Sequence, residues 1–243
     1  MQMIWRMNWH AHLAAAITAF ALSIAPAQAG PMQDFERELR AAYADYRTAL
    51  FRTNTNDKAA STAAIENMGS NWQALTAKWL PAPPPQYSED PNFKPTLEKV
   101  VSILGVARTE TQAGKLTEAH DTLEKIRDEL GNLRRRNGLV VFSDRMNGYH
   151  EQMEKILLGK YDGFDARGVS DLRDDAAVLA HLLEEIAANP PADRDGGYEQ
   201  ALAGVRKSVE DLRTALRTGD VSSIKAAIKM LKPPYARMFL NYG

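Results

Sequence analysis

Few residues of this sequence can bind a metal ion or act in catalysis. The 243-residue chain has five histidines and no cysteine. His10 and His12 lie in an N-terminal segment with the features of a signal peptide, which leaves His120, His150 and His181. The absence of cysteine excludes a disulfide framework, a thiol nucleophile, an iron–sulfur cluster and a thiolate zinc site. Any metal site must therefore use histidine, methionine and carboxylate ligands.

His150 is the strongest candidate for a metal ligand. On a helical projection it falls on the apolar face of its segment, in the arc that holds Met146 and Met153, with Glu154 at the margin. An imidazole between two thioethers suits copper, because soft sulfur favours Cu(I) and nitrogen ligands accept both oxidation states. The alternative is structural, with a histidine at the edge of the core and methionines that fill gaps.

His120 and Glu124 form a second candidate pair. They are four residues apart, as are His150 and Glu154, so each pair shares one face of a helix. If two helices bring the pairs together, the four side chains would offer nitrogen and oxygen ligands to iron, zinc or copper. His181 projects opposite the apolar stripe of its segment and is expected to face solvent.

No enzyme class is indicated by the remaining motifs. The sequence contains no nucleophile elbow, phosphate-binding loop, dinucleotide fingerprint or zinc-protease motif, so we do not expect an enzyme. The 30 basic and 31 acidic residues give a net charge of -1, which excludes a general nucleic-acid binder. The arginine run 134–136 suits the C-terminal end of a helix dipole, and docking of an anion or a partner is the alternative.

Helices account for nearly all of the chain after residue 30. Apolar residues recur at spacings of three and four, and no alternating strand pattern is present. The pattern predicts about eight helices, at about 34–52, 57–79, 93–113, 117–136, from 143 or 144 onward, 170–188, 198–216 and 224–242. Pro233 and Pro234 lie inside the last pattern, which stays in phase through them, so a kink is expected there.

An internal repeat divides the chain into two parts. A shift of 105 residues superimposes the apolar positions and glycines of one predicted helix hairpin on those of another. The matching pairs are Leu97 with Leu202, Val100 with Val205, Gly114 with Gly219, and Gly138 with Gly243. We therefore expect an all-α protein of tandem antiparallel four-helix bundles, with units at 31–138 and 139–243.

The hairpin Gly114-Lys115-Leu116-Thr117-Glu118-Ala119 resembles the second hairpin of the soluble periplasmic b-type cytochrome family. That family is an exported four-helix bundle of about the length of one repeat. It holds haem between a methionine on its first helix and a histidine near the end of its fourth. The resemblance implies a bundle fold and a periplasmic location for this chain.

The haem ligands of that family are not matched. Counted from the shared Gly-Lys pair, the histidine position holds Arg134 in the first unit and Phe239 in the second. No methionine lies near Leu39 or Arg40, where the first-helix ligand would fall. Copper or iron bound directly by side chains is therefore favoured over haem.

The N-terminal segment has the three regions of a cleavable signal peptide. Arg6 precedes an apolar run at about 13–24, and Ala27-Gln28-Ala29 places small residues at the -3 and -1 positions. The run is shorter than the roughly 20 residues that span a bilayer, and no later segment is apolar enough to do so. We expect residues 1–29 to be removed and the mature chain to reach a bacterial periplasm.

These observations favour an exported, non-enzymatic helical-bundle protein. It would bind a metal ion, copper or iron, or a small ligand, and serve in metal handling or as an electron-transfer accessory. The alternative is a non-catalytic structural or interaction module that docks a protein partner in the cell envelope. Neither function involves a nucleic-acid partner, and we expect no membrane span in the mature chain.

Cleavage of the signal peptide can be tested directly. Intact-mass measurement of the protein from a periplasmic fraction should give a chain that begins at Gly30. Ala29→Phe places a large residue at the -1 position, so the precursor should accumulate. A periplasmic product that still begins at Met1 would contradict the assignment.

Overall fold

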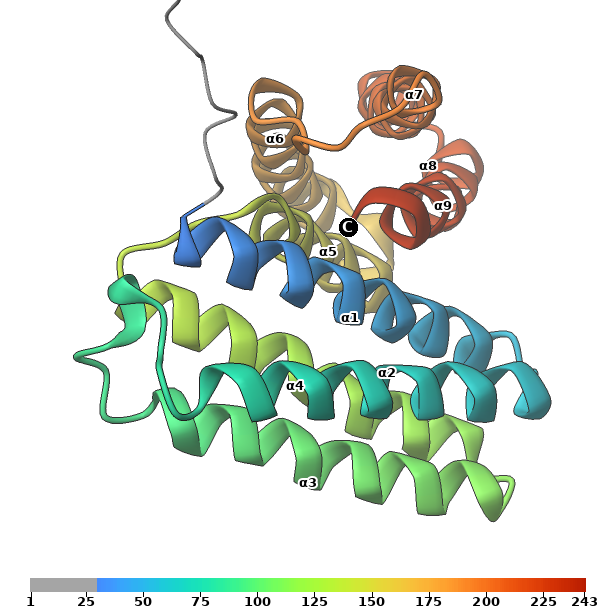
Figure 1. Cartoon of the computed structure of the whole chain (residues 1–243). Coiled ribbons are helices and arrows are strands. Elements are labelled where there is room, and N and C mark those ends of the chain that lie inside the picture. The colour runs from blue at the N-terminus through green and yellow to red at the C-terminus, as the bar shows by residue number, and fades with distance from the viewer. Residues whose placement is uncertain (1–29) are drawn as a thin grey trace, which may run out of the picture.

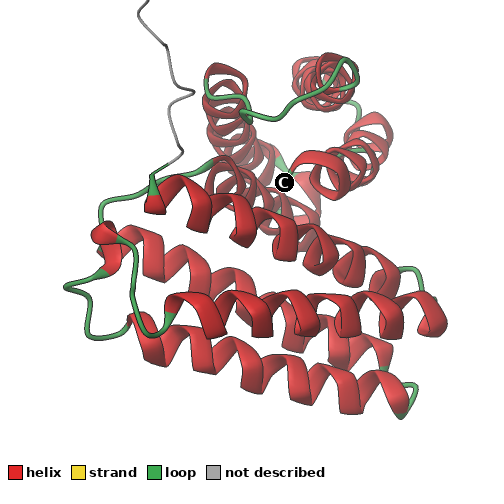
Figure 2. Cartoon of the chain, viewed as in Figure 1, coloured by secondary structure: helices red, strands yellow, loops and turns green. Residues whose placement is uncertain are grey.

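The structure, a computed structural model, describes residues 30–243, and the segment assigned to the signal peptide lies outside these residues. The predicted all-α class is confirmed for the described part, which contains helices, turns and loops and no strand (Figure 2). The α-helices are α1 (Pro31–Asn54), α2 (Lys58–Trp79), α3 (Phe93–Gln112), α4 (Leu116–Arg136), α5 (Phe142–Leu158), α6 (Ala166–Ala188), α7 (Tyr198–Thr218), α8 (Val221–Lys229) and α9 (Lys232–Tyr242). Two short 3-10 turns are η1 (Pro85–Tyr87) and η2 (Asp162–Phe164).

Helices α1 to α4 run antiparallel, each beside the next, and α1 also contacts α4 (Figure 1). Their apolar stripes meet in a core that includes the fully buried Leu97 and Leu123. At one end the ring of Tyr87 stacks on Phe93, and both rings lie against Phe35. This aromatic group closes the end of the four helices where the long connection from α2 to α3 crosses.

Helices α5 to α9 form the second set. Helix α6 contacts α5 and α7, and α7 contacts α8 and α9, which both reach back to α5. In Figure 1 this set is seen nearly end-on, whereas α1 to α4 run across the picture. Helix α1 also contacts α9, and one continuous hydrophobic core extends through both sets. No helix within residues 30–243 is long and apolar enough to cross a membrane.

The last predicted helix is two helices, α8 and α9, rather than one kinked helix. Pro233 and Pro234 fall in the first turn of α9, where a backbone N–H has no partner to lose, so they favour a new helix start. Ile228 and Leu231 on either side of the break remain buried, which explains why the apolar pattern stayed in phase. Helix α6 begins earlier than the predicted Ser170, because Asp165 caps it.

Gly114 and Gly219, which the 105-residue shift superimposes, have the same backbone conformation. Their φ angles are +77° and +74°, in the left-handed region that glycine reaches without a steric penalty. Each ends a helix and allows the chain to turn directly into the next one. The two hairpins therefore share their turn geometry as well as their apolar spacing.

The core contact of Trp72 should dominate the stability of the first set. Its side chain is 1% exposed, and its indole N–H donates to the main-chain oxygen of Leu97 at 3.0 Å. Trp72→Ala should lower the free energy of unfolding by about 3–5 kcal/mol, measured by urea denaturation with circular dichroism. The control Val101→Ala, at a position 52% exposed, should change it by less than about 0.5 kcal/mol. Equal effects of the two substitutions would contradict the packing described.

Candidate functional site

Three of the residues singled out from the sequence lie together at the contact between α4 and α5. The Nε2 atom of His150 is 3.5 Å from Oε1 of Glu124, and Nε2 of His120 is 3.9 Å from the same oxygen. His120 and Glu124 come from adjacent turns of α4, and His150 comes from α5. The two imidazoles therefore converge on one carboxylate oxygen.

These side chains line a cavity of about 580 Å³ between α1, α4, α5 and α9. Apolar side chains form much of its wall, together with the charged and imidazole groups. The apolar members are Leu50, Phe51, Met153, Leu158, Tyr235, Ala236 and Phe239. The cavity can thus hold an ion or a small molecule in contact with both kinds of surface.

The other predicted residues differ in their relation to this cavity. Met153 is fully buried and lines it, whereas Met146 is fully buried and is not among the lining residues. The main-chain oxygen of Met146 instead accepts a hydrogen bond from the Tyr235 hydroxyl at 3.2 Å. Glu154 lies at the margin of the cavity, with its Oε1 atom 3.5 Å from Nζ of Lys232. The structure therefore brings one methionine, rather than two, to the cavity of His150.

Arg127 contacts the same carboxylate, although the sequence analysis did not identify it as a residue of the site. Its Nη2 atom donates to Oε1 of Glu124 at 3.0 Å, and the guanidinium is largely buried. The i, i+3 spacing of an acidic and a basic residue on one helix was the available signal. Arg127 therefore neutralises the carboxylate on which the histidines converge.

His120 is oriented by groups from α1. Its Nδ1 atom lies 3.2 Å from the main-chain oxygen of Leu50 and 3.1 Å from the hydroxyl of Thr53. A carbonyl oxygen can only accept, so this contact favours the tautomer with the proton on Nδ1. The lone pair of Nε2 then faces the cavity, as a metal ligand requires.

The His150 ring packs against Tyr235 and contacts Glu124 through Nε2. The ring centroids of His150 and Tyr235 are 5.5 Å apart with an interplanar angle of 30°, and Tyr235 stacks in turn on Tyr149. The Nδ1 atom of His150 is buried and has no hydrogen-bond partner among the described residues. The ring is therefore fixed in its plane while Nε2 points toward Glu124.

The surroundings set the charges of two of the three groups. Contact with His150 is the largest effect and lowers the pKa of Glu124 to about 2; together with the smaller effect of the positive charge of Arg127 it outweighs burial, which raises the pKa. Burial lowers the pKa of His120, and this outweighs the opposite effect of Glu124. At neutral pH the site thus presents a charged carboxylate and a neutral imidazole, the forms that bind metal ions.

The site is not a ready-made metal centre. Within residues 30–243 no three histidine, aspartate or glutamate side chains are grouped as a set that could already hold an ion. Comparison with protein-family models, curated proteins and solved structures gave no match to this chain. Any function of this cavity therefore depends on its side chains and on the rearrangement that binding of a metal ion requires.

The charge on Glu124 should make stability depend on pH. A carboxylate whose pKa is lowered on folding, from 4.5 to about 2, stabilises the fold above pH 4.5, and this contribution is lost as the pH falls toward 2. Glu124→Gln should reduce the free energy of unfolding at pH 7 by about 1–2 kcal/mol, since the side chain is 31% exposed and partly screened. The two proteins should converge in stability near pH 2.

Urea denaturation at a series of pH values measures this difference. The control Glu89→Gln removes an exposed carboxylate in the connection before α3 and should leave the pH dependence unchanged. A constant offset between wild type and Glu124→Gln from pH 7 to pH 2 would contradict the assigned charge state.

Proposed function

We propose that the protein is exported to the periplasm and binds a transition-metal ion, copper or iron, through His120, Glu124 and His150. The observation that carries this proposal is the convergence of two imidazole nitrogens on one carboxylate oxygen, at 3.5 and 3.9 Å. Ligand atoms about 2.0–2.2 Å from a tetrahedral ion lie about 3.3–3.6 Å from one another. The two nitrogen–oxygen separations lie within or slightly above this range, which supports ligation after a rearrangement of the side chains.

Binding also requires a change at Arg127. Its guanidinium occupies Oε1 of Glu124 in the described structure, at 3.0 Å. An incoming cation must displace the guanidinium or use the second carboxylate oxygen, because two cations at one oxygen repel each other. This competition favours an ion that binds imidazole strongly and disfavours Mg²⁺ or Ca²⁺, which depend on carboxylate oxygen.

The donor types are consistent with either metal. Two imidazoles and one carboxylate with further positions open suit Fe(II), and the same nitrogens suit Cu(II). Met153 lines the cavity and brings a thioether, the donor that Cu(I) prefers. Titration with each metal separates these alternatives.

The setting of the site supports metal handling or an accessory role in electron transfer. His120 and Glu124 are partly exposed, so an ion could enter and leave without unfolding of the bundle. No nucleophile paired with a base was recognised among the motifs of the sequence. We therefore propose a binding protein rather than an enzyme, in which one cavity takes up and releases its ion.

We further propose that the fold consists of tandem four-helix units at 31–138 and 139–243. The matched apolar positions and the equal turn geometry of Gly114 and Gly219 support this division. In the second unit the fourth helix is divided into α8 and α9, a difference that Pro233 and Pro234 explain. The candidate metal site then lies where the two units meet.

Metal titration of the full mature chain tests the proposal. Isothermal titration with Cu(II), and with Fe(II) under anaerobic conditions, should give one site tighter than about 1 μM. His120→Ala and His150→Ala should each weaken binding by about tenfold or more, because each removes one nitrogen ligand. Glu124→Gln should do the same by removing the carboxylate charge.

His181→Ala is the matched control, since His181 is an exposed histidine on α6 outside the cavity. It should leave the affinity unchanged, and circular dichroism should show that every variant remains helical. A wild type that binds no metal, or equal affinity in wild type, His120→Ala and His150→Ala, would refute the proposal.

A further inference from the structure

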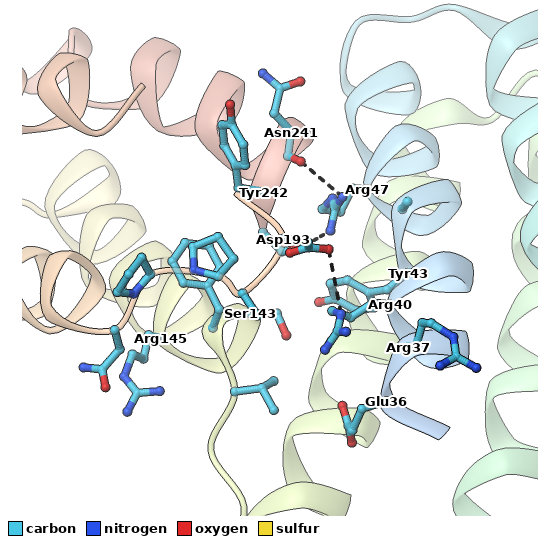
Figure 3. Close-up of a pocket in the computed structure, with 18 of the residues that line it drawn as sticks. Glu36, Arg37, Arg40, Tyr43, Arg47, Ser143, Arg145, Asp193, Asn241 and Tyr242 are labelled. Atoms are coloured by element: carbon cyan, nitrogen blue, oxygen red, sulfur yellow. Dashed lines mark hydrogen bonds and ion pairs between the residues drawn. The ribbon is translucent and has the colours of Figure 1, made fainter. Parts of the chain in front are cut away.

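A second and larger cavity, of about 820 Å³, lies between α1 and the two connections that precede α5 and α7. Figure 3 shows α1 on one side of this cleft and residues of the start of α5 on the other. The end of α9 closes a third side. None of the residues that line this cleft also lines the candidate metal site, so the two are separate.

Arginine side chains are prominent in the lining of the cleft. Five arginines and three acidic side chains line it, and two of the arginines pair with acidic side chains outside the lining, Asp34 and Asp144. The arginines are Arg37, Arg40, Arg47, Arg134 and Arg145, and the acidic residues are Glu36, Asp193 and Asp195. Only an arginine whose acidic partner is weak or absent can bind an anion here, and the low-dielectric walls of a recess strengthen that attraction.

Two of these arginines already serve the fold. Arg47 donates to main-chain oxygens at the end of α9, including that of Leu240 at 3.2 Å. Arg37 forms an ion pair at 2.7 Å with Asp34, which lies outside the cleft. The guanidinium groups of these two side chains are therefore already engaged.

Arg40 and Arg145 retain capacity to bind. Arg40 lies 3.9 Å from Asp193, a distance at which the pair is loose and exposed to solvent. Arg145 takes part in none of the ion pairs of the described residues. They come from α1 and α5, on opposite sides of the cleft (Figure 3).

Arg134 also lines the cleft, but its side chain is almost fully buried. Its side chain is 3% exposed; one guanidinium nitrogen pairs with Asp144 at 2.9 Å, while Nε has no hydrogen-bond partner. The hydroxyl of Tyr43, also 3% exposed and among the lining residues, has none either. A buried donor without an acceptor is costly, and native structures contain few. Both atoms are buried, so they lie beneath the cleft and do not serve as its donors to a ligand.

We propose that this cleft binds a small oxyanion with at least two negative charges, a phosphate or a polycarboxylate, between Arg40 and Arg145. Guanidinium groups suit this chemistry because their planar N–H donors match the oxygens of phosphate and carboxylate groups. When the ligand enters, Asp193 loses its weak contact with Arg40 and becomes solvated instead. The volume of the cleft fits a small molecule, and the ligand needs no metal at the other site.

Isothermal titration of the mature chain with inorganic pyrophosphate and with citrate, at low ionic strength, tests this proposal. Arg40→Ala and Arg145→Ala should each weaken binding by about tenfold, because each removes a charge-assisted contact. Arg206→Ala is the matched control, since Arg206 pairs with Glu184 on the surface away from the cleft, and it should have no effect. Arg145→Lys, which keeps the charge but loses the fork of donors, should lie between Arg145→Ala and wild type.

The relative affinities identify the ligand chemistry. Tighter binding of pyrophosphate indicates a phosphate ligand, tighter binding of citrate indicates a polycarboxylate, and similar affinities indicate recognition of charge alone. The proposal is overturned if neither anion binds at up to about 10 mM. It is also overturned if Arg206→Ala weakens binding as much as Arg40→Ala and Arg145→Ala.

Discussion

The structure has to tolerate polar side chains that are buried where α1, α4 and α5 meet. This burial is the constraint on which the rest of the structure depends. Tyr43, Tyr46 and Asn147 each have a buried polar atom without a hydrogen-bond partner, and so do Arg127 and Arg134. Each such atom costs about 1–3 kcal/mol, so the continuous hydrophobic core around them must offset the penalty. The two sets of helices are thus joined through a polar contact that apolar packing on both sides makes tolerable.

Both candidate sites are consequences of this junction. Arg127 lines the cavity with the two histidines, and Arg134, two turns further along the same face of α4, lines the arginine cleft. One helix therefore carries a guanidinium toward each cavity. At the first, Arg127 contacts a carboxylate that lies between two imidazoles, whereas at the second Arg134 pairs with Asp144. The same burial that makes these groups expensive also strengthens their interaction with a partner of opposite charge.

Much of the fold follows from apolar periodicity, and much of the site does not. Spacings of three and four residues were sufficient to predict the helices, because each has one buried stripe. The break before Pro233 was missed because the stripe continues through it in phase. The i, i+4 spacing suggested that His120, Glu124, His150 and Glu154 could meet across a seam; the structure brings the first three together, whereas Glu154 lies beside Lys232. Helical projection could not exclude Met146. A projection gives the direction of a side chain around the helix axis, but not its position along the axis relative to the cavity between α1 and α9. The contact of Thr53 with His120 joins residues 67 apart, and no local pattern predicts it.

The hydrogen bonds that Arg47 donates to the end of α9 affect the order of folding. Most neighbouring helices are consecutive in the chain, so their hairpins close short loops and can form early. The contacts of Arg47 with the chain end span 193 to 196 residues, and their closure carries the largest loop entropy of the contacts described above. Docking of α9 onto α1 is therefore expected to be a late event, after the hairpins have formed. Until then the carbonyl groups at the end of α9 and the guanidinium of Arg47 both remain solvated, and both of the cavities that α9 helps to close stay incomplete.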